Sequence, residues 1–198
     1  LEDNFSTKIF AYAIDDIRKN EFIEKATKLR KSTFSKYEQL LNLIEEFLLE
    51  LLDKKNDRDF AARLADNFPE DNSMQEKLLK NGPLLLIPAV KDELPAEDIA
   101  ISLFKLKLIH DEFGMHGIEN LVRNSNIYYF TKGLSISSSR MNSEYAAKII
   151  KERKKSILNE LGIKLKMIID AATCIRENTS TYIILELMSS YTVYDFEE

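Results

Sequence analysis

The sequence predicts an all-α protein, a multi-helix bundle built from long helices. Glycine and proline, which interrupt helices, number only 5 and 4 among 198 residues. Apolar side chains make up 44% of the chain and recur at helical spacing through much of it. Charged residues, at 31%, suit helices whose outer faces contact water. We expect residues 1–198 to form a single helical domain, large enough to bury a core without disulfides or metal.

The first two expected helices lie at the N-terminal end. Asn4 or Ser6 can cap the first helix, and the second runs from about Glu21 to Lys55, with a bend or a split favoured near its Ser-Thr-Phe-Ser segment. Residues 40–52 of this second helix are apolar around more than half of its circumference. Such a helix is either central in a bundle or covered by another subunit, so we predict a homo-oligomer as one way of covering it.

Shorter helices are expected in the middle of the chain. The segment "DRDFAARLADNF" predicts a short amphipathic helix, and Ser73 with Glu76 three residues later predicts a capping box at the start of the next one. Residues 84–95 contain two prolines and predict a packed connector instead of a strand. A clear helix then runs from about residue 96 to Gly114, with a further turn or two beyond it.

The pattern changes around the sequence "SNIYYFTKGLSISSS". Its β-branched and aromatic residues predict a small β-hairpin near residues 126–138, as an insertion spanning residues 125–139. A long C-terminal helix is expected at 142–177, with Tyr145 at the start of its apolar stripe. Residues 181–194 fit helix and strand equally well.

Composition excludes several classes of protein. Cys174 is the only cysteine, so no disulfide can form within the chain. The sequence shows no secretory signal and no apolar run near the roughly 18 residues that cross a bilayer. We therefore expect no membrane association and an intracellular, cytoplasmic location. The net charge of −5 argues against a general affinity for nucleic acid, although it allows a local basic patch.

Both histidines fall in "LIHDEFGMHG", the segment closest to a chemical motif. His110 continues the apolar stripe of its helix, so we expect a half-buried histidine near the helix end. His110 and His116 are six residues apart and do not share a helix face, and Gly114 separates Glu112 from His116. These spacings do not suit a helical metal pair, so we predict no metal site and no cofactor.

His110 and Asp111 nevertheless resemble motifs of two enzyme families. As a doublet they are similar to the metal-binding pair of the HD phosphohydrolases, a family that needs a further upstream histidine which this chain lacks. Together with Gly114 they resemble the H-D-x-x-G phosphoacceptor box of one class of sensor histidine kinases. That resemblance implies that His110 is the phosphoryl nucleophile and Asp111 its general base.

An acidic stripe on the second helix gives a third resemblance. Glu46, Glu50 and Asp53 share one helix face and resemble the carboxylate pairs that hold magnesium in all-helical nucleotide pyrophosphohydrolases. The same three residues also fit a simple solvated stripe on an otherwise buried helix.

Charge is segregated along the chain. Residues 18–36 and residues 148–166 each contain seven Lys or Arg against two Glu, whereas residues 45–71 contain nine acidic against four basic residues. If the two basic stretches lie side by side, they form a cationic face for nucleic-acid phosphates or for an acidic partner, and neighbouring aromatics could add stacking. They also fit ordinary solvated helix faces. The stacking candidates are Tyr128, Tyr129 and Phe130, and the candidate binding residues are Lys28, Arg30, Lys31, Lys151, Arg153, Lys154 and Lys155.

The leading hypothesis for function is a non-enzymatic regulatory or interaction protein that presents helical faces to a protein partner. The alternative is a nucleic-acid-binding subunit that uses the basic helices 18–36 and 148–166. A second alternative is a phosphotransfer or metal-dependent enzyme centred on His110 and Asp111.

Overall fold

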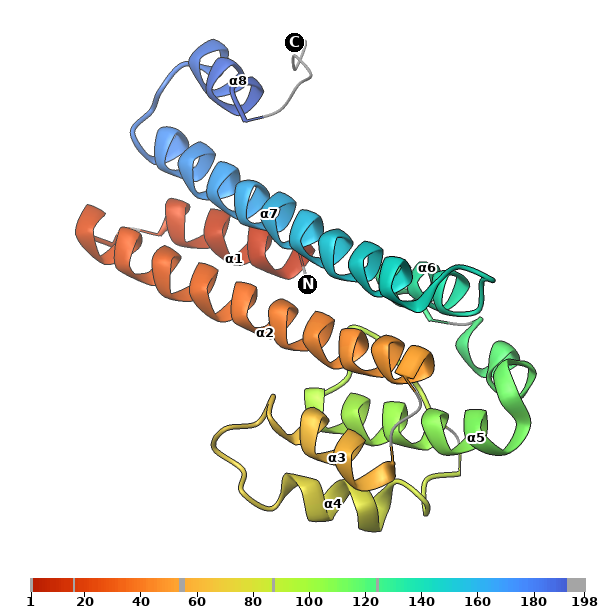
Figure 1. Ribbon diagram of the computed structural model, residues 1–198. Coiled ribbons are helices and arrows are strands. Elements are labelled where there is room, and N and C mark those ends of the chain that lie inside the picture. Colours follow the sequence, from red (N-terminus) through yellow and green to blue (C-terminus); the bar gives the residue numbers. More distant parts are fainter. Residues whose placement is uncertain (1, 16, 54–55, 87, 124, 192–198) are drawn as a thin grey trace. The chain divides into compact units, whose positions relative to one another are not determined.

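The computed structural model describes residues 2–15, 17–53, 56–86, 88–123 and 125–191, and every regular element in these ranges is a helix (Figure 1). This confirms the predicted all-α architecture. None of these helices combines the length and the apolarity that a membrane crossing requires. The helices are α1 (Glu2–Ile14), α2 (Lys19–Asp53), α3 (Asp57–Ala65), α4 (Met74–Asn81), α5 (Ala96–Val122), α6 (Tyr128–Ser137), α7 (Ser143–Arg176) and α8 (Thr181–Ser189).

The chain divides into two compact units. The terminal unit comprises residues 1–36 and 156–198, and the central unit comprises residues 37–155. The division passes through α2 and α7, which continue without interruption from one unit into the other. The prediction of a single domain therefore remains a prediction. The expected split of α2 does not occur, and the Ser32 hydroxyl donates to the carbonyl of Leu29 at 3.0 Å within the intact helix.

Aromatic rings form the core of the central unit. The ring of Phe47 on α2 lies 6.4 Å from that of Phe60 on α3 and 5.9 Å from that of Phe130 on α6. Phe60 in turn stacks on Phe104 of α5 at 5.9 Å. These four rings are at most 1% exposed, so one continuous aromatic contact joins four helices.

The apolar face of α2 is covered within this core. Its members are at most 7% exposed, which shows that the chain itself buries the helix. This helix consequently supplies no argument for the predicted homo-oligomer. The residues concerned are Leu40, Leu41, Leu43, Ile44, Phe47, Leu48 and Leu51.

Residues 128–137 form the helix α6, so the predicted β-hairpin near residues 126–138 (insertion 125–139) is wrong. Tyr129, Phe130, Gly133 and Leu134 lie on one face of this helix and are all buried. A Cβ atom at Gly133 would lie 2.1 Å from Leu48 Cδ1, so this glycine permits close packing on α2 and is not a turn residue. Burial against α2 outweighs the local β propensity of the segment.

The terminal unit is held together by one arginine as well as by its apolar core. The Arg176 guanidinium, at the end of α7, donates to the backbone carbonyls of Ala13 at 3.4 Å, Asp15 at 3.0 Å and Ile17. It also lies over the ring of Phe22, 5.7 Å from the centroid. The arginine thereby satisfies carbonyls at the end of α1 and of two residues that follow it, Asp15 and Ile17.

Two further local predictions have clear outcomes. The capping box at Ser73 is wrong, because the Ser73 hydroxyl donates to Asp71 Oδ1 at 2.7 Å and makes no cap to the helix. The ambiguous tail is helical over Thr181–Ser189, which is α8. None of the residues of α8 is buried.

The close contact of α6 with α2 generates a testable prediction. We expect Gly133→Ala to lower the free energy of unfolding by about 1–3 kcal/mol, because the new methyl group must displace Leu48 in a packed core. Gly162→Ala in α7 is the matched control, since its Cβ would lie 3.7 Å from Phe34, an ordinary contact. The control should be neutral or more stable by about 0.5–1 kcal/mol.

Urea unfolding of the two variants beside the wild-type chain measures both changes. If Gly133→Ala proves as stable as Gly162→Ala, the packing of α6 on α2 described above is incorrect.

Candidate functional site

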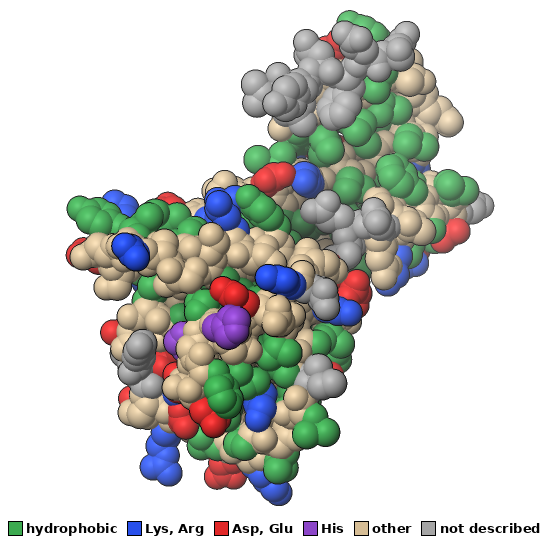
Figure 2. Space-filling view, turned by 90° about the vertical axis from the view of Figure 1, so that its right-hand side faces the viewer, with side chains coloured by type: hydrophobic (Ala, Val, Ile, Leu, Met, Phe, Trp, Pro, Cys, Tyr) green, Lys and Arg blue, Asp and Glu red, His purple; other side chains and the backbone are tan. Residues whose placement is uncertain are grey.

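His110 lies half-buried on α5, as the sequence predicts, with 13% of its side chain exposed. Its Nδ1 atom is 3.7 Å from Asp111 Oδ1, which is beyond hydrogen-bond distance. His116 is 94% exposed and follows a break in the helix at Gly114, where φ is 68°. Figure 2 shows histidine at the surface beside acidic side chains. Each histidine thus faces a carboxylate of α5, Asp111 for His110 and Glu119 for His116.

A buried lysine holds the carboxylate beside His110. Asp111 Oδ2 is 2.6 Å from the Lys107 ammonium, which also pairs with Asp57 and is only 4% exposed. Burial lowers the pKa of Lys107, but the hydrogen bonds to Asp111 and Asp57 outweigh it and leave the pKa above its ordinary value. Asp111 could act as a base for His110 only by weakening this ion pair.

Arg63 on α3 occupies the centre of the predicted acidic stripe. Its Nε atom is 3.1 Å from Glu46 Oε2, and its Nη2 atom pairs with Glu50, whose side chain is 1% exposed. Burial raises the pKa of Glu46, and although Arg63 lowers it, the pKa remains above its ordinary value. In the described ranges, no three His, Cys, Asp or Glu side chains form a group suited to a metal ion. The guanidinium thus stands where the resemblance to pyrophosphohydrolases would place magnesium.

The seven predicted binding cations fall in both units. Lys28, Arg30 and Lys31 belong to the terminal unit, where Lys28 and Lys31 are exposed. Arg30 Nη2 lies 3.4 Å from the carbonyl oxygen of Gly162, so this part of α2 meets α7 within that unit. The other four cations, at 151 and 153–155, lie on α7 in the central unit.

Three of these four α7 cations already have partners. Lys154 Nζ is 2.6 Å from Glu45 Oε2, an ion pair that neutralises a carboxylate with a side chain 11% exposed. Lys155 pairs with Glu152 at 2.7 Å. Arg153 lies over the Tyr128 ring of α6, 5.0 Å from its centroid, and also donates to its hydroxyl at 3.1 Å.

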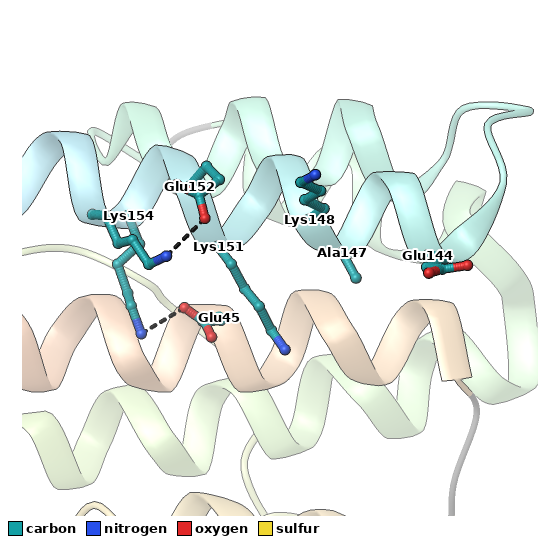
Figure 3. A pocket seen from close by; sticks show the side chains of 8 residues that line it. Glu45, Glu144, Ala147, Lys148, Lys151, Glu152 and Lys154 are labelled. Atoms are coloured by element: carbon teal, nitrogen blue, oxygen red, sulfur yellow. Dashed lines mark hydrogen bonds and ion pairs between the residues drawn. The ribbon is translucent and has the colours of Figure 1, made fainter.

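Lys151 differs from its neighbours because it makes no ion pair or hydrogen bond with any residue in the described ranges. Its side chain extends from α7 toward α2 (Figure 3). It lines a cavity of about 510 Å³ together with Lys148, Glu152 and Glu45. It also lines a neighbouring cavity of about 440 Å³, whose wall includes Arg63. Lys151 thus stands where the two cavities adjoin.

Exposed apolar side chains lie beside these cations, and the sequence did not reveal them. Tyr145 is 67% exposed and Ile149 is 40% exposed, so Tyr145, predicted to start the apolar stripe of α7, lies outside the buried face of that helix. Their four-residue spacing continues to Arg153, which places all three on one stripe of the helix. Ile149 and Ile150 look alike in the sequence, but only Ile150, at 1% exposed, faces the core.

We call this region the α7 surface. Of the three predicted stacking residues, only Tyr128 belongs to it, at 64% exposed, because Tyr129 and Phe130 are buried. The Tyr129 hydroxyl donates to the carbonyl of Ile150 at 3.2 Å and so fixes α6 against α7. The α7 surface consists of Tyr128, Tyr145, Lys148, Ile149, Lys151, Arg153 and Lys155.

The ion pairs of Lys107 give a prediction for pH dependence. Because its pKa is raised above the ordinary value of 10.5, Lys107 should stabilise the fold fully below that pH and progressively less above it. Lys107→Met should lower the unfolding free energy at neutral pH by about 1.5–3 kcal/mol.

The difference between variant and wild type should shrink at alkaline pH, and urea unfolding across that range measures it. Lys80→Met, at an exposed lysine of the same unit, should change stability by less than about 0.5 kcal/mol throughout. A difference for Lys107→Met that stays constant far above pH 10.5 would contradict the assignment.

Comparison with protein-family models, with curated proteins and with solved structures finds no match to this chain. Any functional conclusion therefore depends on the chemistry of the side chains described above.

Proposed function

We propose that this protein is a non-catalytic interaction module that docks a partner protein on its α7 surface. The observation that carries the proposal is the stripe formed by the exposed Tyr145 and Ile149 and the half-buried Arg153, extended by the exposed Tyr128. Tyrosine and arginine are enriched at the energetic centres of protein interfaces. Stacking on Tyr128 restricts the Arg153 side chain before a partner arrives, which reduces the entropy lost on binding.

The helix that bears this stripe suits such a role. Ala146 and Ile150, which follow Tyr145 and Ile149 in the sequence and point about a quarter turn away from them, are at most 1% exposed and anchor the helix in the central unit. A rigid helix with one face buried can present the other face in a fixed geometry. Exposed apolar groups at a fixed spacing favour a partner over solvent.

Nucleic-acid binding by the basic stretches is the alternative proposal, and it has weaker support. Arg153 beside Tyr128 could stack on a base. However, Lys154 and Lys155 already pair with Glu45 and Glu152, and those carboxylates would repel a phosphate backbone.

A phosphotransfer or metal-dependent enzyme centred on His110 has the least support. Its neighbouring carboxylate, Asp111, is held by Lys107 at 2.6 Å. The imidazole is also 3.7 Å from that carboxylate, so the pair lacks the hydrogen bond that a base and nucleophile need.

Photo-cross-linking tests the interaction role. Benzoylphenylalanine in place of Tyr145 in the full chain, in a lysate of the source cells, should give one discrete adduct with a single protein. That protein is then purified and titrated against Ile149→Asp, which should weaken binding about tenfold or more, a loss of about 1.4 kcal/mol.

Leu86→Asp is the matched control, since Leu86 is 92% exposed in the same unit and lies outside the α7 surface. It should leave the affinity unchanged, and circular dichroism should show the same helicity for both variants. If no discrete adduct forms, or if both variants bind the partner equally, the proposed function is wrong.

A further inference from the structure

The α7 surface is locally cationic in a chain that is acidic overall. Residues 144–155 contain five Lys or Arg and two Glu, whereas the whole chain carries a net charge of −5. A positive patch on a negative molecule orients an approaching partner by attracting its acidic side. The positive charge of this patch therefore favours a partner whose contacting side is acidic.

Not all of these cations are equally available to a partner. Lys154 is committed to the buried Glu45, and Lys155 pairs with Glu152 and lowers its pKa through their hydrogen bond. Lys148 and Lys151 are exposed and have no ion pair with any residue in the described part of the chain. Both ammonium groups therefore remain able to form ion pairs with carboxylates of a partner.

The available cations lie next to the apolar stripe. Tyr145 is the helix neighbour of Ile149 four residues later and of Lys148 three residues later, and Lys148 is in turn the neighbour of Lys151, so the two lysines adjoin the apolar pair through Tyr145. Lys148 and Lys151 both line the cavity of about 510 Å³, where the small side chain of Ala147 leaves room between α7 and α2 (Figure 3). A cavity of this volume is in the range that accommodates ligand groups.

Two features favour a peptide over a nucleic acid as the occupant. Glu144 and Glu152 are interspersed among the lysines, and Glu45 lines the cavity, so evenly spaced phosphates would meet several carboxylates. A peptide, in contrast, can carry carboxylates at the positions that face lysines and neutral side chains at the positions that face glutamates. Ile149, at 40% exposed, offers aliphatic contact, which suits an apolar side chain better than a base.

We infer that the α7 surface binds an acidic amphipathic segment of a partner protein. Its carboxylates contact Lys148 and Lys151, and an adjacent aliphatic or aromatic side chain packs across Tyr145 and Ile149. This inference rests on the proposed interaction function and adds the chemistry of the partner to it.

Selection from a display library of short random peptides on the immobilised full chain tests this inference. The recovered peptides should be rich in Asp and Glu with at least one large apolar residue. Titrated by fluorescence anisotropy, they should lose about tenfold or more in affinity for the double variant Lys148→Glu/Lys151→Glu. Raised salt should also weaken binding to the wild-type chain, because exposed ion pairs are screened.

The double variant Lys80→Glu/Lys91→Glu makes the same charge change at two exposed lysines elsewhere in the central unit, and it should bind as the wild type does. The inference is overturned if no recovered peptide depends on Lys148 and Lys151, or if the selected peptides are neutral or basic. Peptides of that kind that still depend on Ile149 would leave the interaction function standing.

Labelled oligo(dT) is the second probe. If oligo(dT) binds in a salt-sensitive way, the Lys148→Glu/Lys151→Glu variant abolishes that binding, and no acidic peptide is recovered, then the α7 surface binds nucleic acid and the inference of a peptide is wrong. The cross-linking experiment tests the interaction function, and the peptide titrations test the acidity of the partner segment. Because either result can be negative while the other is positive, the two proposals can be told apart.

Discussion

The central unit depends on covering the apolar side of α2 between residues 40 and 51. Seven large apolar side chains project from this stretch, and leaving them in water would cost more than typical net fold stability. The ring contacts of Phe47 bring α3 and α6 onto the helix, and Phe60 carries the contact on to α5. Because α6 in turn is fixed to α7 by the Tyr129 hydroxyl, this burial also decides which side of α7 faces water.

Covering α2 also draws charged groups out of water, and the fold compensates for each of them. Glu45 and Glu50, on the same helix, are both buried, and each has a cation supplied by another helix, Lys154 for Glu45 and Arg63 for Glu50. A buried carboxylate without such a partner would be strongly destabilising. Those cations are consequently part of the fold, and basic residues counted in the sequence overstate the charge available for binding.

Helical periodicity predicted most of the fold because the apolar residues of α2, α5 and α7 recur at helical spacing. The prediction of a hairpin at 125–139 was wrong because the aromatic and β-branched residues of that segment favour a strand locally, whereas packing against α2 imposes the helix α6. Charge counting found the α7 cations but could not separate Lys154, which pairs with Glu45, from Lys151, which has no partner among the described residues. Nor could it decide that Ile149, and not Ile150, faces water, since that depends on where α2 and α6 lie.

The exposure of Tyr145 and Ile149 is notable because α7 could have buried or replaced them at little cost to the fold. The inward residues Ala146 and Ile150 already fill the core, and we expect a polar residue to be tolerated at 149, where the side chain is 40% exposed. The proposed partner contact would account for these two apolar groups, which adjoin Lys148 through Tyr145. Arg153, restrained by Tyr128, continues the same stripe of α7 without taking part in the buried ion pairs.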